Sequence, residues 1–102
     1  MILVRHEIGE VLRDFRQQKG RTLRQVASRA SVALGYLSEV ERGQKEASSE
    51  ILASVAEALD VPISIIMREV GDRISVLEGL QTFPDVVPDE LMAEVGQELS
   101  LR

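Results

Sequence analysis

The sequence lacks the residues on which several classes of protein depend. Its 102 residues include no cysteine, no tryptophan and one histidine. Without cysteine, the chain cannot form a disulfide framework, a thiolate zinc site or a cysteine nucleophile. The single histidine, His6, lies near the N-terminus, so a Ser-His-Asp triad would depend on a residue that we expect to be frayed. No acid/base pair, phosphate loop or metal cluster stands out, and we expect a protein that is not an enzyme and has no cofactor or metal.

Long apolar segments are also missing. The longest uncharged apolar stretch lies around Val61–Met67, far short of the roughly 20 residues that a membrane helix needs. The opening residues, MILVRHE, reach charged side chains too soon for a signal peptide. We therefore expect a cytoplasmic protein without a membrane partner. The length suits a single domain with one hydrophobic core.

Charge is unevenly distributed along the chain. The formal net charge is −5, but residues 1–45 carry nine Lys and Arg against five Asp and Glu, a net charge of +4. Residues 46–102 carry three against twelve, a net charge of −9. This asymmetry indicates one face that binds a polyanion. It fits equally well with basic and acidic halves that attract each other.

The spacing of apolar residues predicts an all-α fold of short helices. Apolar residues recur at helical intervals, as at Ile8, Val11, Leu12 and Phe15, and no segment keeps the period of two that a strand needs. Caps and breakers bound the predicted helices. The first ends at Lys19-Gly20, the second begins at Thr22, the third spans Ala33–Arg42, the fourth begins near Ser48 or Ser49, and the fifth begins around Pro62, with Gly71-Asp72 as a potential break.

The second and third predicted helices are joined by only Ser31-Val32, which is typical of a helix-turn-helix. We place Leu37 at the centre of the inner face of the third helix. Its outer face then carries Gly35, Ser38, Glu39 and Arg42. Small and polar side chains at this spacing can enter a major groove and meet base edges. A solvated helix of any function would also have a polar outer face.

Glu41 is the exception to the apolar inner face of the third helix, since it lies beside Leu37. A carboxylate that faces a core is costly unless it has a partner. Arg16 follows Leu12 by four residues and so borders the inner face of the first helix. We predict a charge-assisted pair between Arg16 and Glu41 that clamps the two helices together and has a structural role.

The segment Gly20–Leu59 resembles the Cro/CI-like (xenobiotic-response-element type) helix-turn-helix domains. The strongest match is YLSEVERG at Tyr36–Gly43, followed by a helix that starts with Ser and ends in AEALDVP. The resemblance implies a compact five-helix DNA-binding domain at residues 1–67, with the helix-turn-helix at about 22–43, and a C-terminal helical extension at 68–102. Within the family, GRTLRQV and LGYLSEVERG look most like the Clp-protease gene regulators of actinobacteria.

Four positions depart from the family pattern. Ser31 stands where a turn Gly is usual, so a left-handed residue there would be strained. Ala33 replaces the usual Ser cap of the recognition helix, which leaves its first N–H groups for water or a DNA phosphate. Leu23 and Ala47 replace a Gln and a Pro. These departures weaken the transfer of any particular base contact.

The resemblance implies two sets of DNA contacts. Phosphate contacts, which supply affinity without sequence information, are expected from Arg21, Arg24, Tyr36, Arg42, Gln44 and Lys45. Base contacts are expected from Ala33, Leu34, Gly35, Ser38 and Glu39. Three of these assignments have alternatives: Leu34 touches a thymine methyl or packs on a flank, Tyr36 donates to a phosphate or packs, and Glu39 accepts from a cytosine or pairs with Arg42.

One such domain reads only a few base pairs, so useful specificity needs two half-sites on double-stranded DNA. The chain also has more apolar residues near and beyond the usual end of the family domain than a five-helix core requires. We therefore expect a homodimer on a pseudo-palindromic operator. The predicted dimer interface comprises Ile66, Val70, Ile74, Leu77 and Leu80. The alternative is that Val70–Leu80 caps its own subunit.

From Phe83 onward, five acids stand against Arg102. This segment is expected to be a helix that crosses the partner subunit, a surface that contacts RNA polymerase, or a solubilising tail. The resemblance alone implies a transcriptional activator of Clp protease genes under stress. An antitoxin whose C-terminal segment binds a toxin and a ligand-responsive repressor remain as alternatives.

Overall fold

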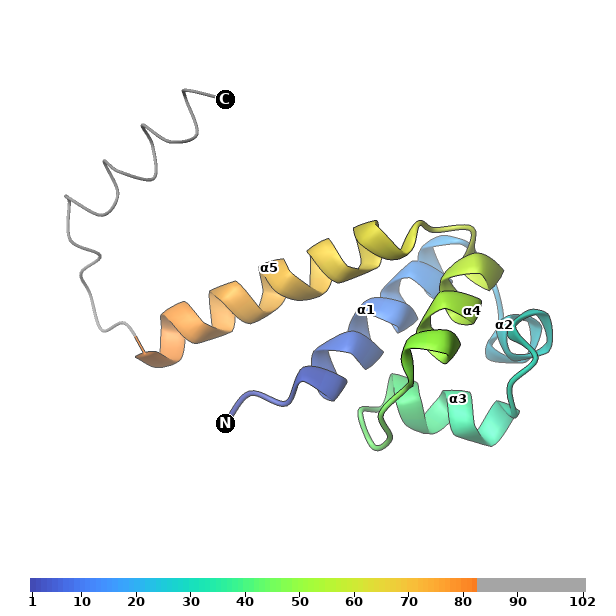
Figure 1. Ribbon diagram of the computed structural model, residues 1–102, viewed down its shortest axis with the longest axis horizontal. Coiled ribbons are helices and arrows are strands. Elements are labelled where there is room, and N and C mark those ends of the chain that lie inside the picture. The colour runs from blue at the N-terminus through green and yellow to red at the C-terminus, as the bar shows by residue number, and fades with distance from the viewer. Residues whose placement is uncertain (83–102) are drawn as a thin grey trace, which may run out of the picture.

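The computed structural model describes residues 1–82, which form five helices and contain no strand. The helices are α1 (Val4–Gln18), α2 (Leu23–Ala30), α3 (Leu34–Glu41), α4 (Ser49–Leu59) and α5 (Ile63–Thr82). The helix α5 packs along α1, and α2, α3 and α4 gather at one end of this pair (Figure 1). The all-α fold expected from the sequence is confirmed.

Side-chain caps fix where two of the helices begin. The hydroxyl of Thr22 accepts a hydrogen bond from the Gln25 amide at 3.1 Å, and the Gln25 side chain accepts one from the Thr22 amide at 2.8 Å. This reciprocal capping box sets the start of α2. The hydroxyl of Ser48 accepts from the Ile51 amide at 3.3 Å and so caps α4.

Two helices end in left-handed residues that are not glycine. Ser31 ends α2 with φ 57° and ψ 41°, and Asp60 ends α4 with φ 56° and ψ 40°. A side chain in this region carries steric strain that glycine avoids. Ser31 therefore occupies the left-handed position that was expected from the sequence to be strained for a residue other than glycine.

The hydrophobic core lies where all five helices meet. Its largest members have almost no solvent exposure: Leu12, Leu37, Leu59, Ile66, Val11, Val26, Val40 and Val55. Each helix contributes at least one of these side chains. The helix α3 is consequently held on its inner face by the same core that α1, α4 and α5 share.

The helix α5 continues through Gly71 without a break. The domain boundary expected between residues 67 and 68 therefore lies inside a helix. Ile66 and Val70 are buried in the core of their own chain, so they are not available to a second subunit in this conformation. Farther along α5, Leu80 is 79% exposed and Val76 is 63% exposed.

Two further expectations concern membrane helices and the acidic C-terminal segment. Among the described residues, no helix has both the length and the apolar character needed to cross a membrane. The predictions for the acidic segment fall on residues 83–102, outside the described residues.

Candidate nucleic-acid interface

The turn between α2 and α3 is short and leaves the start of α3 uncapped. Ser31 reverses the chain, and the amide of Val32 donates to the carbonyl oxygen of Ala27 at 3.0 Å. Ala33 is the N-cap of α3, and its side chain offers no acceptor to the first amides of the helix. These amides carry the positive end of the helix dipole, which favours an anion such as a phosphate.

The helix α3 has one buried face and one accessible face. Leu37, Val40 and Glu41 are buried, whereas Leu34 and Gly35 are exposed near the start of the helix. Of the remaining predicted contacts, Ala33 and Arg42 are exposed, and Ser38 and Glu39 are half-buried. The residues expected to meet base edges thus have access to solvent.

Gly35 has open space around it. A Cβ atom built at this position has no heavy atom within 4 Å, so the fold itself does not require a glycine there. Glycine inside a helix lowers stability by roughly 0.5–1 kcal/mol relative to alanine. A residue that costs stability without a packing reason fits a position where a ligand approaches the backbone.

Basic side chains line a hollow of about 560 Å³ beside the start of α2. Its arginines are Arg21, Arg24 and Arg29. Arg21 and Arg29 lie 2.5 Å and 3.7 Å from the carboxylate of Asp60. The exposed Arg24 has no hydrogen bond or ion pair with another described residue, so its guanidinium is free to meet a phosphate.

Arg21 and Tyr36 make contacts within the chain that their predicted role did not include. Arg21 Nη1 donates to the carbonyl oxygen of Ala58, and Nη2 donates to Asp60 Oδ2 at 2.5 Å, so the residue ties the start of α2 to the end of α4. The hydrogen bond from Arg21 lowers the pKa of the Asp60 carboxyl. The Tyr36 hydroxyl donates to the carbonyl oxygen of Glu46 at 2.8 Å.

Glu39 pairs with a residue of the following loop. Its Oε2 lies 3.7 Å from Lys45 Nζ, and its carbonyl oxygen accepts a hydrogen bond from the Gln44 amide at 2.9 Å. The alternative partner considered from the sequence was Arg42, which remains exposed. The structure therefore brings together two expected DNA contacts, Glu39 and Lys45, and places Gln44 beside them.

The structure also brings Arg16 and Glu41 together. Arg16 Nε donates to Glu41 Oε2 at 2.8 Å, and Nη2 donates to Oε1 at 3.0 Å. This hydrogen bonding raises the pKa of Arg16, against the lowering effect of its burial. The pair fixes the end of the recognition helix to α1, as the sequence suggested from two unlike charges on facing inner surfaces.

Two residues that position the interface were missed in the sequence. A Cβ atom on Gly9 would lie 2.6 Å from the carbonyl oxygen of Glu41, so glycine allows α1 to approach the end of α3. Arg73 on α5 lies 3.5 Å from Glu10 on α1 and also pairs with Asp14. Neither contact follows from local spacing, because each depends on how two distant helices cross.

Comparison with known proteins decides the family. A family model described as helix-turn-helix matches residues 12–66, which include α2, α3 and the turn between them. The chain belongs to the helix-turn-helix family. The Cro/CI-like resemblance read from the sequence is thereby confirmed.

Relatives within this helix-turn-helix family are regulators of transcription. The transcriptional regulator ClgR of Mycobacterium tuberculosis (strain ATCC 25618 / H37Rv) is 50% identical over 78 residues, which are 76% of this chain and 70% of that protein. The regulator SinR of Bacillus subtilis (strain 168) is 36% identical over 63 residues, which are 61% of this chain and 57% of that protein.

Solved structures show the same relationship. The crystal structure of the clp gene regulator ClgR from Corynebacterium glutamicum matches with a TM-score of 0.72 and 39% identity, over 92% of this chain and 90% of that chain. The protein is therefore a helix-turn-helix transcriptional regulator closely related to ClgR. Its relatives are regulators, in agreement with the expectation that it is not an enzyme.

Proposed function

We propose that the protein is a cytoplasmic, sequence-specific activator of Clp protease genes that binds a pseudo-palindromic operator as a homodimer. The observation that carries this proposal is the exposed, uncapped start of α3 at Ala33, Leu34 and Gly35. A helix with its inner face in the core and its amino end free can enter the major groove and present that end to base edges.

The proposed contacts fall into two groups around α3. Base contacts come from Ala33, Leu34, Gly35, Ser38 and Glu39. Phosphate contacts come from Arg24, Arg42, Gln44 and Lys45. Two further residues act indirectly in this proposal: Tyr36 holds the loop after α3 through the Glu46 carbonyl, and Arg21 anchors α2 to α4.

The proposed dimer interface uses the second half of α5. Val76 and Leu80 are exposed apolar side chains, and Ile74 and Leu77 are half-buried on the same helix. Because Ile66 and Val70 are buried in the intrachain core, we restrict the interface to the later residues, of which Ile74 also packs partly against that core. A two-fold pair joined there would present two recognition helices to half-sites about 34 Å apart.

The target genes are proposed from the relationship to ClgR. A relative solved from Corynebacterium glutamicum is described as a clp gene regulator. Half the residues aligned with the Mycobacterium tuberculosis ClgR are identical. We extend the regulation of clp genes to this chain, and we propose activation from the family resemblance of the sequence alone.

Selection of bound fragments from the organism's own sheared genome tests the proposal directly. We would use about 150 mM salt, because non-specific binding is suppressed at that ionic strength. The expected result is a few promoters that share an inverted repeat, with Clp protease genes among them. Recovery of nothing above background would contradict DNA regulation, and recovery of other promoters would contradict the proposed targets.

Sedimentation of the full chain at operator-binding concentrations tests the dimer separately. The expected species is a dimer that binds one inverted repeat. A monomer at these concentrations would contradict the proposed assembly while leaving the promoter result standing.

A further inference from the structure

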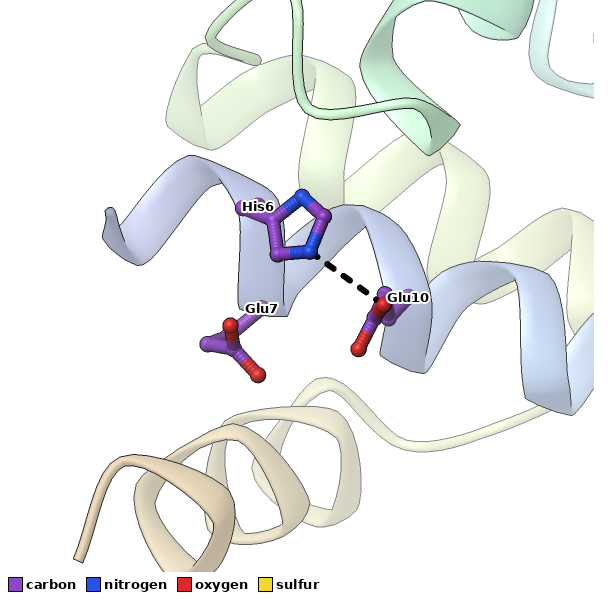
Figure 2. Close-up of side chains that lie close together, drawn as sticks. All are labelled: His6, Glu7 and Glu10. Carbon is purple, nitrogen blue, oxygen red and sulfur yellow. Dashed lines mark ion pairs between the residues drawn. The ribbon is translucent and has the colours of Figure 1, made fainter. Parts of the chain in front are cut away.

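The start of α1 carries three potential metal ligands side by side. His6, Glu7 and Glu10 each offer one ligand atom, and these atoms all lie within 4.8 Å of one another. Figure 2 shows the two carboxylates on the side of α1 that faces α5, with the imidazole of His6 directed at Glu10. The spacing His-Glu-x-x-Glu places all three residues on the first two turns of the helix.

Glu7 is the residue that calls for an explanation. The residue is only 8% exposed, and its carboxylate makes no hydrogen bond or ion pair with another described residue, so its oxygens keep what contact with solvent the residue has. A buried charge is normally paired or bound to a metal, because removal from water is costly. Glu7 and Arg73 line the same hollow, together with Val76 and Leu77.

Arg73 is committed to other carboxylates. It lies 3.5 Å from Glu10 and 3.5 Å from Glu69, and it also donates a hydrogen bond to Asp14. Three carboxylates therefore pair with one guanidinium between α1 and α5, and Glu7, which lines the same hollow as Arg73, adds a fourth negative charge nearby. The group has an excess of negative charge at the point where Glu7 is buried.

The expectation that His6 is frayed was wrong, because His6 lies within α1 and is held beside these carboxylates. Its Nε2 lies 3.2 Å from Glu10 Oε1. A Cβ atom on Gly43 would lie 2.9 Å from His6 Nδ1, so the ring packs directly against the backbone that follows α3. This packing limits the orientations of the ring, so its Nε2 stays on the side of Glu10.

We propose that His6, Glu7 and Glu10 bind a divalent transition-metal ion such as Zn²⁺. One imidazole nitrogen and two carboxylate oxygens suit this ion, whereas Mg²⁺ and Ca²⁺ prefer ligands that are all oxygen. Ligand atoms around tetrahedral Zn²⁺ lie about 3.3 Å apart, and small rotations of the two Glu side chains would bring the three atoms this close. His6 and Glu10 are half-exposed, which leaves a path for the ion and room for a water ligand.

The ion would join three parts of the fold. Glu7 faces α5, Glu10 is shared with Arg73, and His6 contacts the chain just beyond the recognition helix. A bound ion would balance the excess negative charge and hold the start of α1 against α5. Metal binding is therefore expected to raise stability, independently of whether the operator proposal holds.

The test uses the full chain without a histidine tag, so that His6 is the only imidazole in the sample. Calorimetric titration with ZnCl₂ is expected to show one ion per chain, and NMR is expected to show the imidazole signals shifting with it. A saturating amount is expected to raise the Tm by about 4 °C or more. The same concentration of Mg²⁺ is expected to leave the imidazole signals unchanged.

Two isosteric variants test whether the ion binds at these carboxylates. Glu7→Gln and Glu10→Gln are each expected to weaken Zn²⁺ binding about tenfold or more, because an amide is a poor ligand for this ion. The matched control is Glu50→Gln, which changes an exposed carboxylate on α4 and is expected to keep the affinity within about twofold.

Several results would overturn the proposal. These are no Zn²⁺ binding up to about 1 mM, an unchanged affinity in Glu7→Gln, or imidazole signals that do not move when the ion binds. The imidazole signals are read in the unmodified protein, so the proposal can fail even where a variant does not fold.

Discussion

Arg16 and Glu41 join α1 to the end of α3 through two parallel hydrogen bonds. The distances are 2.8 Å from Nε to Oε2 and 3.0 Å from Nη2 to Oε1, and the side chains are 16% and 8% exposed. Arg16 Nη1 also donates to the carbonyl oxygen of Arg21 at 3.0 Å. One guanidinium thus positions both ends of the helix-turn-helix relative to α1.

Substitution Glu41→Gln is expected to lower the free energy of unfolding by about 3 kcal/mol. The variant keeps the shape of the side chain but leaves the Arg16 charge largely buried without a counter-charge. Urea unfolding measures the loss, and Glu57→Gln, at an exposed position on α4, is the matched control, expected within about 0.5 kcal/mol of the parent. A loss equal to that of the control would contradict a clamping role.

Substitution Gly9→Ala is expected to destabilise the protein by about 1–3 kcal/mol. Its Cβ would meet the backbone carbonyl groups of Val40 and Glu41, which cannot move without shifting α3. The matched control is Gly71→Ala on α5, where the added Cβ meets nothing within 4 Å. The control is expected to gain about 0.5–1 kcal/mol from helix propensity, and equal effects at the two positions in thermal unfolding would rule out the steric explanation.

These two contacts show how far the sequence could predict the fold. The Arg16–Glu41 pair could be predicted from the sequence, because helical periodicity places each residue on an inner face, where a lone charge needs a partner. The need for glycine at position 9 could not be predicted, because the periodicity of α1 does not indicate how closely α3 crosses it. Local patterns predict which face is buried, whereas closest approaches depend on tertiary geometry.

The candidate interface shows the same difference between features that local patterns predict and contacts that depend on tertiary packing. The outer face of α3 and the capping role of Thr22 were predicted from local rules. The partner of Glu39 was not, since the chain turns at Gly43, with φ 75°, and Lys45 comes within reach of Glu39 after that turn. Arg21 likewise meets Asp60 only because α2 packs against α4.

The pair of Arg21 and Asp60 gives stability a specific dependence on pH. The hydrogen bond from Arg21, and then its charge, hold the pKa of Asp60 below its ordinary value of 3.8. The folded state therefore binds fewer protons at this group than the unfolded state. The contribution is fully present above about pH 4 and is lost as the pH falls through the folded-state pKa.

The variant Asp60→Asn removes this charge while keeping a residue that tolerates the left-handed conformation at φ 56°. The parent is expected to be more stable than the variant at about pH 6, and the difference is expected to shrink as the pH falls below about 4. Thermal unfolding of both proteins across this range measures it, and titrations shared by the two chains cancel in the difference. A difference that stays constant into the acid range would show that the carboxylate charge does not contribute.

Arg24 is expected to supply phosphate affinity to the proposed operator complex. Its side chain is exposed on α2 and has no partner among the described residues. Arg24→Ala is expected to weaken binding to all sequences about equally and to lower the salt slope by about one unit. Arg68→Ala, at an exposed position on α5, is the control that should leave both quantities unchanged. Loss of affinity for one operator alone would assign Arg24 to base readout.

Substitution of Gly35 is expected to affect folding stability and operator affinity in opposite directions. Because its Cβ position is open, Gly35→Ala is expected to stabilise α3 by about 0.5–1 kcal/mol. If DNA approaches this backbone, as the proposed function requires, the added methyl group is expected to weaken operator binding about tenfold. Fluorescence anisotropy measures the affinity and thermal unfolding measures the stability.

The control for Gly35→Ala is again Gly71→Ala, which is expected to gain similar stability without loss of operator affinity. A gain in stability together with a loss of affinity in Gly35→Ala alone would show that the glycine is kept for the ligand. Unchanged affinity would remove Gly35 from the proposed interface. The base contacts would then be assigned to Ser38 and Glu39, because these residues continue the accessible face of α3 toward its carboxyl end.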